Sequence, residues 1–329
     1  MSTPPAFQLS YKPLHEFGPH NGQIFSMDDT ILQARGVASS GRIKAIALMC
    51  SAVTLFSCLD TTAKYLVSHS NISTAQVVWL RFVGQFLLMT VILGPWNIPA
   101  LFRTRKLGLQ MTRSFLMAAT TTCNFIAVRY LRLDQTVSIA FLAPLVVATL
   151  AGPFLGEWVG WRRMLAIIIG FVGILIVVVR PGFTQIHPAF LVSFAAMIAY
   201  ALFMLLTRKL SVFDPPLVTL FYALLFGTIG AAPIALAQWV WPESATQWLL
   251  LLSLGAFGGF GHYLLIHAYR LAPASSVTPF LYFQLLSMAG LGYFIFSDVP
   301  DQRTMAGSAV VIASGLYLVH RERVTRGLS

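Results

Sequence analysis

The sequence contains very little charge. Aspartate, glutamate, lysine and arginine make up 10% of its 329 residues, against about 25% in an ordinary soluble domain. Hydrophobic residues make up 57%, and the mean hydropathy is +0.75. A chain this apolar cannot cover a water-exposed surface with polar groups, so the composition predicts a membrane protein.

Three further absences restrict the function. The cysteines, Cys50, Cys58 and Cys123, lie in apolar segments without the spacing of a metal or redox site, so we interpret them as small buried hydrophobes and expect no metal. The pattern GxxxxGK[ST] does not occur, which excludes a P-loop ATPase. No nucleic-acid-binding motif accompanies the net charge of +11. We therefore expect no cofactor and no nucleic-acid partner, and attribute the basic excess to membrane topology.

Apolar segments of about 20 residues, the length that crosses a bilayer, follow one another along the chain. We place spans near 44–67, 74–95, 110–128, 134–154, 163–180, 187–207, 216–240, 248–268, 274–296 and 304–320. They lack the alternation of barrel strands, and backbone groups in lipid must pair internally, so the fold class is an all-α polytopic membrane protein with ten transmembrane helices. Residues 1–41 are polar and predict a disordered cytoplasmic tail, and residues 321–329 a short cytoplasmic tail.

The basic residues indicate the orientation. Lys64 and Arg81 lie within spans, and all the other lysines and arginines except four fall on the side of the N-terminus. Those four are Arg129, Arg132, Arg180 and Arg303. Because cytoplasmic loops carry the excess of basic residues, both termini are expected in the cytoplasm.

The chain also repeats itself weakly. Shifted by 141 residues, AVRYLRLD (127–134) aligns with AYRLAPAS (268–275), and Glu157 aligns with Asp298. Residues 42–182 and 183–320 therefore predict two five-helix repeats. Because five is odd, the second repeat enters the membrane inverted, an arrangement typical of carriers that work by alternating access.

Two stretches carry a family resemblance. RYLRLDQTVSIAFLAPLVVATLAGPFLGEWVGWRRMLAIIIGFVGILIVVVRPG (129–182) resembles the first EamA-type repeat of the drug/metabolite transporter (DMT) superfamily. GHYLLIHAYRLAPASSVTPFLYFQLLSMAGLGYFIFSDVPDQRTMAGSAVVIASGLYLVHRER (261–323) resembles the second. One departure is Asp298, which stands where the glutamate of FGE is common in the family.

The resemblance, which covers about 42–323, implies a multi-pass carrier of the bacterial inner membrane, with a central cavity lined by helices of both repeats. We expect an exporter of a small polar or amphipathic metabolite, embedded in the lipid bilayer. Coupling to protons or another ion and assembly as a homodimer are both compatible with it. An intramembrane enzyme and a non-transporting ligand sensor are the alternatives, and the sequence offers neither a catalytic cluster nor a signalling domain.

Three charges lie inside the first two spans. Asp60 and Lys64 are one helical turn apart on one face, so each can neutralise the other. Alone, each would cost about 2.5–3.5 kcal/mol at mid-membrane. Arg81 must likewise face protein, a cavity or a carboxylate. Two interpretations stay open: a self-satisfied Asp60–Lys64 pair, or an Asp60–Lys64–Arg81 cluster whose surplus positive charge attracts an anionic substrate group.

Other polar side chains within spans are candidates for lining the cavity. They are Asn124, Tyr200, His262, Tyr263, His267, Tyr282 and Gln284. Each can contact substrate or form a hydrogen bond between helices, and His262 and His267 can also titrate near neutral pH. Glu157 and Asp298 lie at helix ends, where we expect a structural role, pairing with a nearby arginine and capping the next helix, rather than proton coupling.

Overall fold

The computed structural model describes residues 27–155, 160–178, 187–271 and 277–326. The chain divides into residues 1–41 and 42–329, and the contacts below belong to the second unit. In the first unit, residues 27–41 are helical, rather than irregular as expected from their polar composition. They form the start of a helix that continues into the first apolar segment.

In the described ranges the regular secondary structure is helical, with no strand. Its first half contains α1 (Met27–His69), α2 (Thr74–Leu93), η1 (Pro95–Asn97), α3 (Ile98–Leu101), α4 (Leu107–Tyr130), α5 (Leu133–Ala140), α6 (Ala143–Leu155) and α7 (Trp161–Val178). The second half contains α8 (Pro188–Leu210), α9 (Pro216–Ala237), α10 (Ala245–Leu271), η2 (Thr278–Tyr282), α12 (Phe283–Phe296) and α13 (Gln302–Arg326). Each expected span coincides with one helix or with two consecutive ones.

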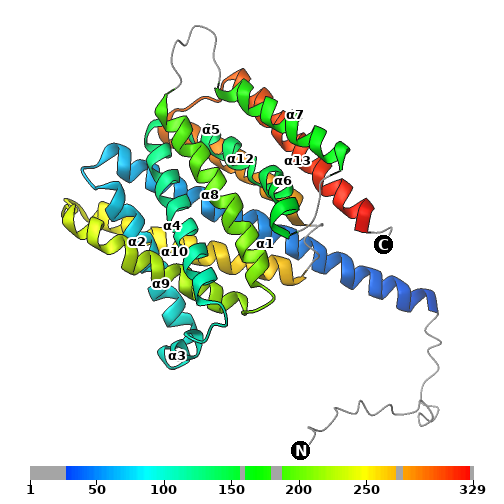
Figure 1. The fold of residues 1–329 in the computed structure, drawn as a ribbon, viewed down its shortest axis with the longest axis horizontal. Coiled ribbons are helices and arrows are strands. Elements are labelled where there is room, and N and C mark those ends of the chain that lie inside the picture. Colours follow the sequence, from blue (N-terminus) through cyan, green and yellow to red (C-terminus); the bar gives the residue numbers. More distant parts are fainter. Residues whose placement is uncertain (1–26, 156–159, 179–186, 272–276, 327–329) are drawn as a thin grey trace, which may run out of the picture. The chain divides into compact units, whose positions relative to one another are not determined.

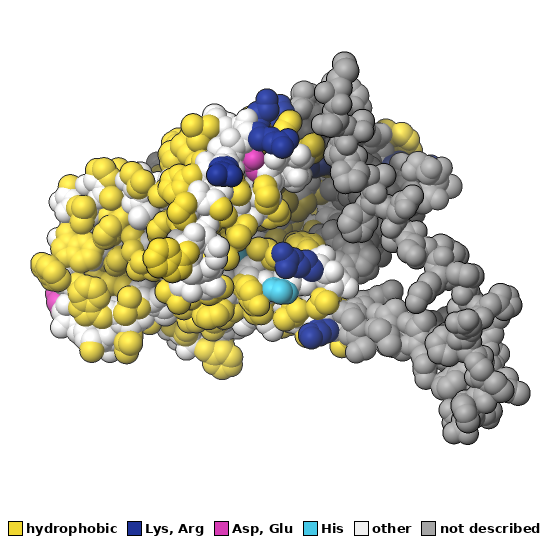
Figure 2. Space-filling view, turned by 90° about the horizontal axis from the view of Figure 1, so that it is seen from below, with side chains coloured by type: hydrophobic (Ala, Val, Ile, Leu, Met, Phe, Trp, Pro, Cys, Tyr) yellow, Lys and Arg dark blue, Asp and Glu magenta, His cyan; other side chains and the backbone are white. Residues whose placement is uncertain are grey.

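Within the described residues, seven segments are long and apolar enough to cross a membrane. The stretch Met164–Val177 of α7 is apolar but shorter. The number ten therefore stays a prediction, whereas a polytopic membrane protein is established. Large apolar side chains point outward, among them Val91 and Phe294, which are 78% and 82% exposed. Figure 2 shows apolar side chains over most of the described surface of one face, with its lysines and arginines toward one end.

Two of the expected spans are interrupted. Between α5 and α6 a turn at residues 141–142 breaks the helix just before Pro144. The segment before α12 is a 3₁₀-helix, η2, with Pro279 in its first turn. Proline has no N–H group to donate to the preceding turn, which explains why regular helix stops near each one. The two interruptions are about 141 residues apart, which is the shift that aligns the chain with itself.

The helices pack in pairs that join the two halves of the chain. Helix α2 lies against α9 and α10, α4 lies against α8 and α9, and α7 lies along α13 (Figure 1). Helices α2 and α10 approach closely, because a Cβ atom added to Gly84 would lie 2.9 Å from the Cα of Gly255. Glycine at both positions lets the two backbones touch.

Positions that correspond in the register of 141 residues contact one another in the packed core, either directly or as reciprocal pairs. The rings of Phe141 and Tyr282 pack edge to face with centroids 4.8 Å apart. A Cβ on Gly170 would meet the Oγ of Ser314 at 3.1 Å, and one on Gly173 would meet a methyl group of Val311 at 3.0 Å. Ser314 corresponds to Gly173, and Val311 to Gly170, so these contacts between α7 and α13 are reciprocal. Their order is reversed along the two helices, which are therefore antiparallel.

Candidate functional site

Arg81 is the buried cation at the centre of the site. It lies on α2 and is 8% exposed. Its Nη1 donates to the hydroxyl of Thr121 on α4, and its guanidinium carbon lies 5.4 Å and 5.7 Å from the ring centroids of Phe82 and Phe125. The Nε–H group has no hydrogen-bond partner within the described residues. Burial of Arg81 agrees with the expectation that it faces protein.

Asp60 on α1 supplies the opposite charge. Its Oδ1 accepts a hydrogen bond from Nδ2 of Asn124, at 3.1 Å. No ion pair of 4.0 Å or less joins Asp60 to Arg81 in the part of the chain that the structure describes. Each charge is therefore held by a neutral side chain of α4 instead of by the other charge.

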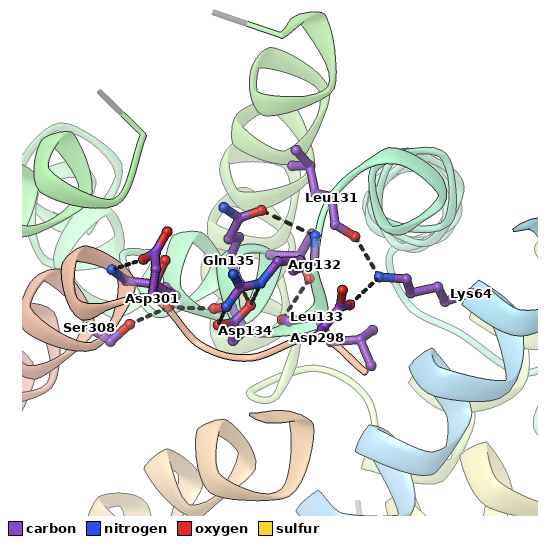
Figure 3. Close-up of polar contacts among 12 residues, drawn as sticks. Lys64, Leu131, Arg132, Leu133, Asp134, Gln135, Asp298, Asp301 and Ser308 are labelled. Atoms are coloured by element: carbon purple, nitrogen blue, oxygen red, sulfur yellow. Dashed lines mark hydrogen bonds and ion pairs between the residues drawn. The ribbon is translucent and has the colours of Figure 1, made fainter. Parts of the chain in front are cut away.

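Lys64 does not pair with Asp60, and that interpretation of the sequence was wrong. Its Nζ donates to Oδ2 of Asp298 at 3.0 Å and to the carbonyl oxygen of Leu131 at 3.1 Å (Figure 3). It also lies 4.7 Å from the ring centroid of Phe296. The reason is its place near the end of α1, where the chain after α4 and the loop after α12 both offer oxygen atoms. We call Lys64, Leu131 and Asp298 the Lys64 network.

The surroundings of the Lys64 network are also polar. The guanidinium of Arg132 donates to both carboxylate oxygens of Asp134, at 3.1 Å and 2.6 Å (Figure 3). The backbone N–H of Arg132 donates to the side-chain oxygen of Gln135. Ser138 on α5 and Ser308 on α13 share a hydrogen bond of 2.6 Å. Asp298, which was expected to cap the next helix, pairs with Lys64. The cap of α13 comes from Asp301 instead, whose carboxylate accepts a 2.6 Å hydrogen bond from the backbone N–H of Thr304. Glu157 lies outside the described residues.

Gln85 and His262 continue the buried polar groups from Arg81. Gln85 follows Arg81 by one turn of α2, and His262 lies on α10. The Nδ1 of His262 is 2.8 Å from the carbonyl oxygen of Gly258. Because a carbonyl oxygen can only accept, Nδ1 is the donor in this hydrogen bond. The same Nδ1 lies 3.4 Å from Nε2 of Gln85. The Oε1 of Gln85 is buried and, within the described residues, has no partner. We call Asp60, Arg81, Gln85, Thr121, Asn124 and His262 the central cluster.

The structure does not bring the remaining candidates into the central cluster. Tyr200 stacks on Phe203, with centroids 5.9 Å apart. Tyr263, which is 48% exposed, packs on His267 of the same helix at 4.3 Å. In the described ranges no hydrogen bond joins Tyr200, Tyr263, His267, Tyr282 or Gln284 to the cluster. A substrate contact by any of these residues stays a prediction.

A second polar network lies near the N-terminal end of α4. The carboxylate of Asp214, between α8 and α9, accepts hydrogen bonds from the hydroxyl of Thr104, the N–H of Arg105 and Nε2 of Gln110, the last at 2.9 Å. Burial opposes ionisation of Asp214, but these bonds and the charge of Arg105 bring its pKa below the usual value. The carboxylate is therefore ionised at neutral pH.

Arg113, one turn further along α4, extends this network. Its Nε donates to the hydroxyl of Thr207 at 2.7 Å and its Nη1 to the carbonyl oxygen of Thr219 at 2.9 Å. Its guanidinium carbon lies 4.3 Å from the ring centroid of Phe203. We call Thr104, Gln110, Arg113, Asp214 and Thr219 the Asp214 network.

Helix α4 fixes the order of the three polar groups. Gln110 belongs to the Asp214 network, Thr121 to the central cluster, and Leu131, just past the helix end, to the Lys64 network. With a rise of about 1.5 Å per residue, Thr121 is about 16 Å from Gln110 and about 15 Å from Leu131. The central cluster thus lies midway between two networks that tie separate parts of the chain together.

The comparison with family models decides what kind of protein has this arrangement. The model of the EamA-like transporter family matches residues 43–179 and again residues 187–320. The chain belongs to the EamA-like transporter family. Members of this family are membrane transporters, not enzymes, and the DMT superfamily resemblance is confirmed.

Several EamA-like relatives have names that state a cargo. An S-adenosylmethionine uptake transporter of Rickettsia prowazekii is 26% identical over 80% of this chain and 88% of its own. A riboflavin transporter of Vibrio cholerae is 26% identical over 83% and 92%. The pseudopaline exporter CntI of Pseudomonas aeruginosa is 24% identical over 76% and 88%. A solved crystal structure shares the fold with a TM-score of 0.57 at 15% identity, covering 87% of this chain and 99% of its own.

Proposed function

We propose that the protein is a secondary transporter that carries a small metabolite across the membrane by alternating access, with the central cluster as its substrate site. The observation that carries this proposal is the position of the cluster. Acidic and basic side chains, and polar atoms without a partner among the described residues, lie midway along α4, on helices that come from both family-matched segments. Polar groups inside a membrane bundle are costly, and they usually mark the substrate pathway.

Contacts between equivalent residues support two inverted repeats, 42–182 and 183–320. Residues close to a two-fold axis contact their own counterparts, as Phe141 and Tyr282 do. The reciprocal contacts of α7 and α13 run antiparallel, which requires an axis perpendicular to the helices. Such an axis lies in the membrane plane when the helices cross the membrane, and it relates inverted repeats.

The two outer networks are suited to open and close in turn. The Lys64 network joins α1 and the end of α4 to the loop after α12, and the Asp214 network joins the segment before α4 to the loop after α8. Each connects one repeat to the other. Rocking of one repeat against the other can break one network while the other stays closed, and the cluster between them then faces alternate sides.

Direction, orientation and coupling belong to the proposal too. The relatives are named as importers and exporters, and we favour export of a small polar or amphipathic metabolite. The basic residues support cytoplasmic termini in a bacterial inner membrane. Coupling to protons through His262 or His267, and a homodimer, stay predictions.

The test is a comparison of cells that express the chain with cells that express Arg81→Gln. Metabolites that differ inside and outside are identified, and their flux is then measured with purified protein in proteoliposomes. S-adenosylmethionine and riboflavin are the first labelled probes, because relatives are named for them. We expect at least a tenfold loss of flux in Arg81→Gln with unchanged membrane insertion. Equal flux through both forms would remove the central cluster from the proposal.

A further inference from the structure

The central cluster contains one acidic and one basic side chain. Lys64, which was expected to add a second cation, forms its ion pair with Asp298 instead. Asp60 and Arg81 remain, and His262 donates from Nδ1 to a carbonyl oxygen, as a neutral imidazole can. The cluster therefore offers a ligand one group of each kind.

The two charges are also kept apart. Asp60 is anchored by Asn124 and Arg81 by Thr121, and no ion pair of 4.0 Å or less joins them in the described ranges. A buried ion pair normally closes, because direct contact repays part of the desolvation cost of both ions. Two separated groups of opposite sign can each bind the complementary group of a molecule that carries both signs itself.

Unpartnered atoms beside these charges indicate how such a molecule would be held. Among the described residues the Nε–H of Arg81 has no acceptor, and the side chain is only 8% exposed. The Oε1 of Gln85, one turn away on the same helix, is likewise buried without a donor in these ranges. Asp60 keeps part of its surface accessible. A carboxylate fits Arg81, and an ammonium group fits Asp60.

We propose that the central cluster binds a compact zwitterion, with its carboxylate on Arg81 and its cationic amine on Asp60. This assignment rests on the proposed transport function and names the substrate class of the same site. The helices around it supply specificity for the rest of the molecule. Binding neutralises both buried charges at once, which a singly charged ligand cannot do.

The test uses three forms of one side chain that differ only in charge. Methionine is a zwitterion, methioninamide is a cation and N-acetylmethionine is an anion, and the same triplets are made for alanine, leucine, phenylalanine and glutamine. Purified full-length protein in lipid nanodiscs is heated with each compound at 10 mM. We expect at least one zwitterion to raise the unfolding temperature by 3 °C or more, with its amide and N-acetyl forms below 1 °C.

Two variants should change the preference in opposite directions. Asp60→Asn leaves a positive site and should favour the N-acetyl form, whereas Arg81→Gln leaves a negative site and should favour the amide. Arg103→Gln and Glu243→Gln, which remove exposed charges, are the matched controls and should keep the wild-type order. If the site variants do not fold, the order measured with the wild type decides alone.

Two results overturn the assignment. One is a wild-type protein that responds equally to a zwitterion and its singly charged forms, and the other is no response to any triplet. Either result leaves transport intact if the metabolite comparison finds flux that depends on Arg81. Absence of flux for every metabolite, together with zwitterion binding, would instead reject the transport proposal.

Discussion

At the scale of single residues, the carboxylate of Asp214 connects its own loop to the segment before α4 and to α4 itself. It is 5% exposed and accepts hydrogen bonds from Thr104, Arg105 and Gln110. Hydrogen bonds to a charged group contribute about 1.5–3 kcal/mol each. We expect Asp214→Asn to lower the free energy of unfolding at pH 7 by about 2 kcal/mol, measured by thermal unfolding in detergent.

The lowered pKa of Asp214 adds a pH dependence to that difference. Because the folded state holds the carboxylate below its usual pKa, its stabilisation is full above the unfolded pKa, about 4, and is lost as the pH falls through the lower folded value. The difference in free energy of unfolding between wild type and Asp214→Asn should therefore become smaller in acid. A difference that stays constant from pH 7 to pH 3 would contradict this.

Single residues also show what the sequence could predict. Burial of Arg81 followed from the cost of a charge in lipid, and Gln85, four residues later on the same helix, could have been found by the same spacing. The partner of Lys64 could not, because Asp298 is 234 positions away and its approach depends on how α1 packs against the loop after α12. Thr121 and Asp214 carried no signal apart from being polar.

At the scale of helices, the contact between α2 and α10 depends on Gly84. A Cβ there would lie 2.9 Å from the Cα of Gly255, and backbone atoms cannot rotate away. We expect Gly84→Ala to destabilise the protein by about 1–3 kcal/mol through overpacking. Thermal unfolding of Gly84→Ala and Gly290→Ala measures this, because a Cβ on Gly290 meets nothing within 4 Å.

Comparison of Gly84→Ala with Gly290→Ala can also contradict this prediction. If both alanine variants unfold at the same temperature, the close approach of α2 and α10 contributes nothing specific. Substrate flux is a second readout, because Gln85 and His262 lie on these two helices and a wider spacing would pull them apart.

The lengths of the apolar segments predicted where the helices lie, but not where they are interrupted. Segments 134–154 and 274–296 were each expected as one membrane span, and Pro144 and Pro279 lie within them. Proline kinks some membrane helices and breaks others, and the choice depends on which neighbours satisfy the freed carbonyl groups. Those neighbours come from distant parts of the chain, so hydropathy alone cannot decide.

At the scale of the whole molecule, the Lys64 network should open during each transport cycle. Lys64→Cys with Asp298→Cys, in a background free of Cys50, Cys58 and Cys123, can be joined by a short bifunctional thiol reagent. We expect joining to stop flux by more than tenfold and a reductant to restore it when the linker contains a disulfide. Lys64→Cys alone, treated identically, is the control. Flux that continues in the joined protein would show that this network does not move.

Orientation is tested with two single cysteines in the same background. Asn71→Cys should react with a membrane-impermeant maleimide added to intact cells, and Arg105→Cys should react only after permeabilisation. The expectation follows from the basic residues on the side of Arg105. The reverse labelling pattern would show that the protein has the opposite orientation in the membrane, with the Lys64 network on the cytoplasmic side and the Asp214 network on the external side.

The reciprocal contacts between α7 and α13 have a consequence for the origin of the chain. A surface on which Gly170 meets the counterpart of Gly173, and Gly173 the counterpart of Gly170, is complementary to itself. If the two halves are inverted repeats, as we propose, two identical copies of one half would insert in opposite directions and adhere along this helix. We infer that the chain arose by fusion of two such copies, and that Gly173 and its counterpart Ser314 diverged afterwards.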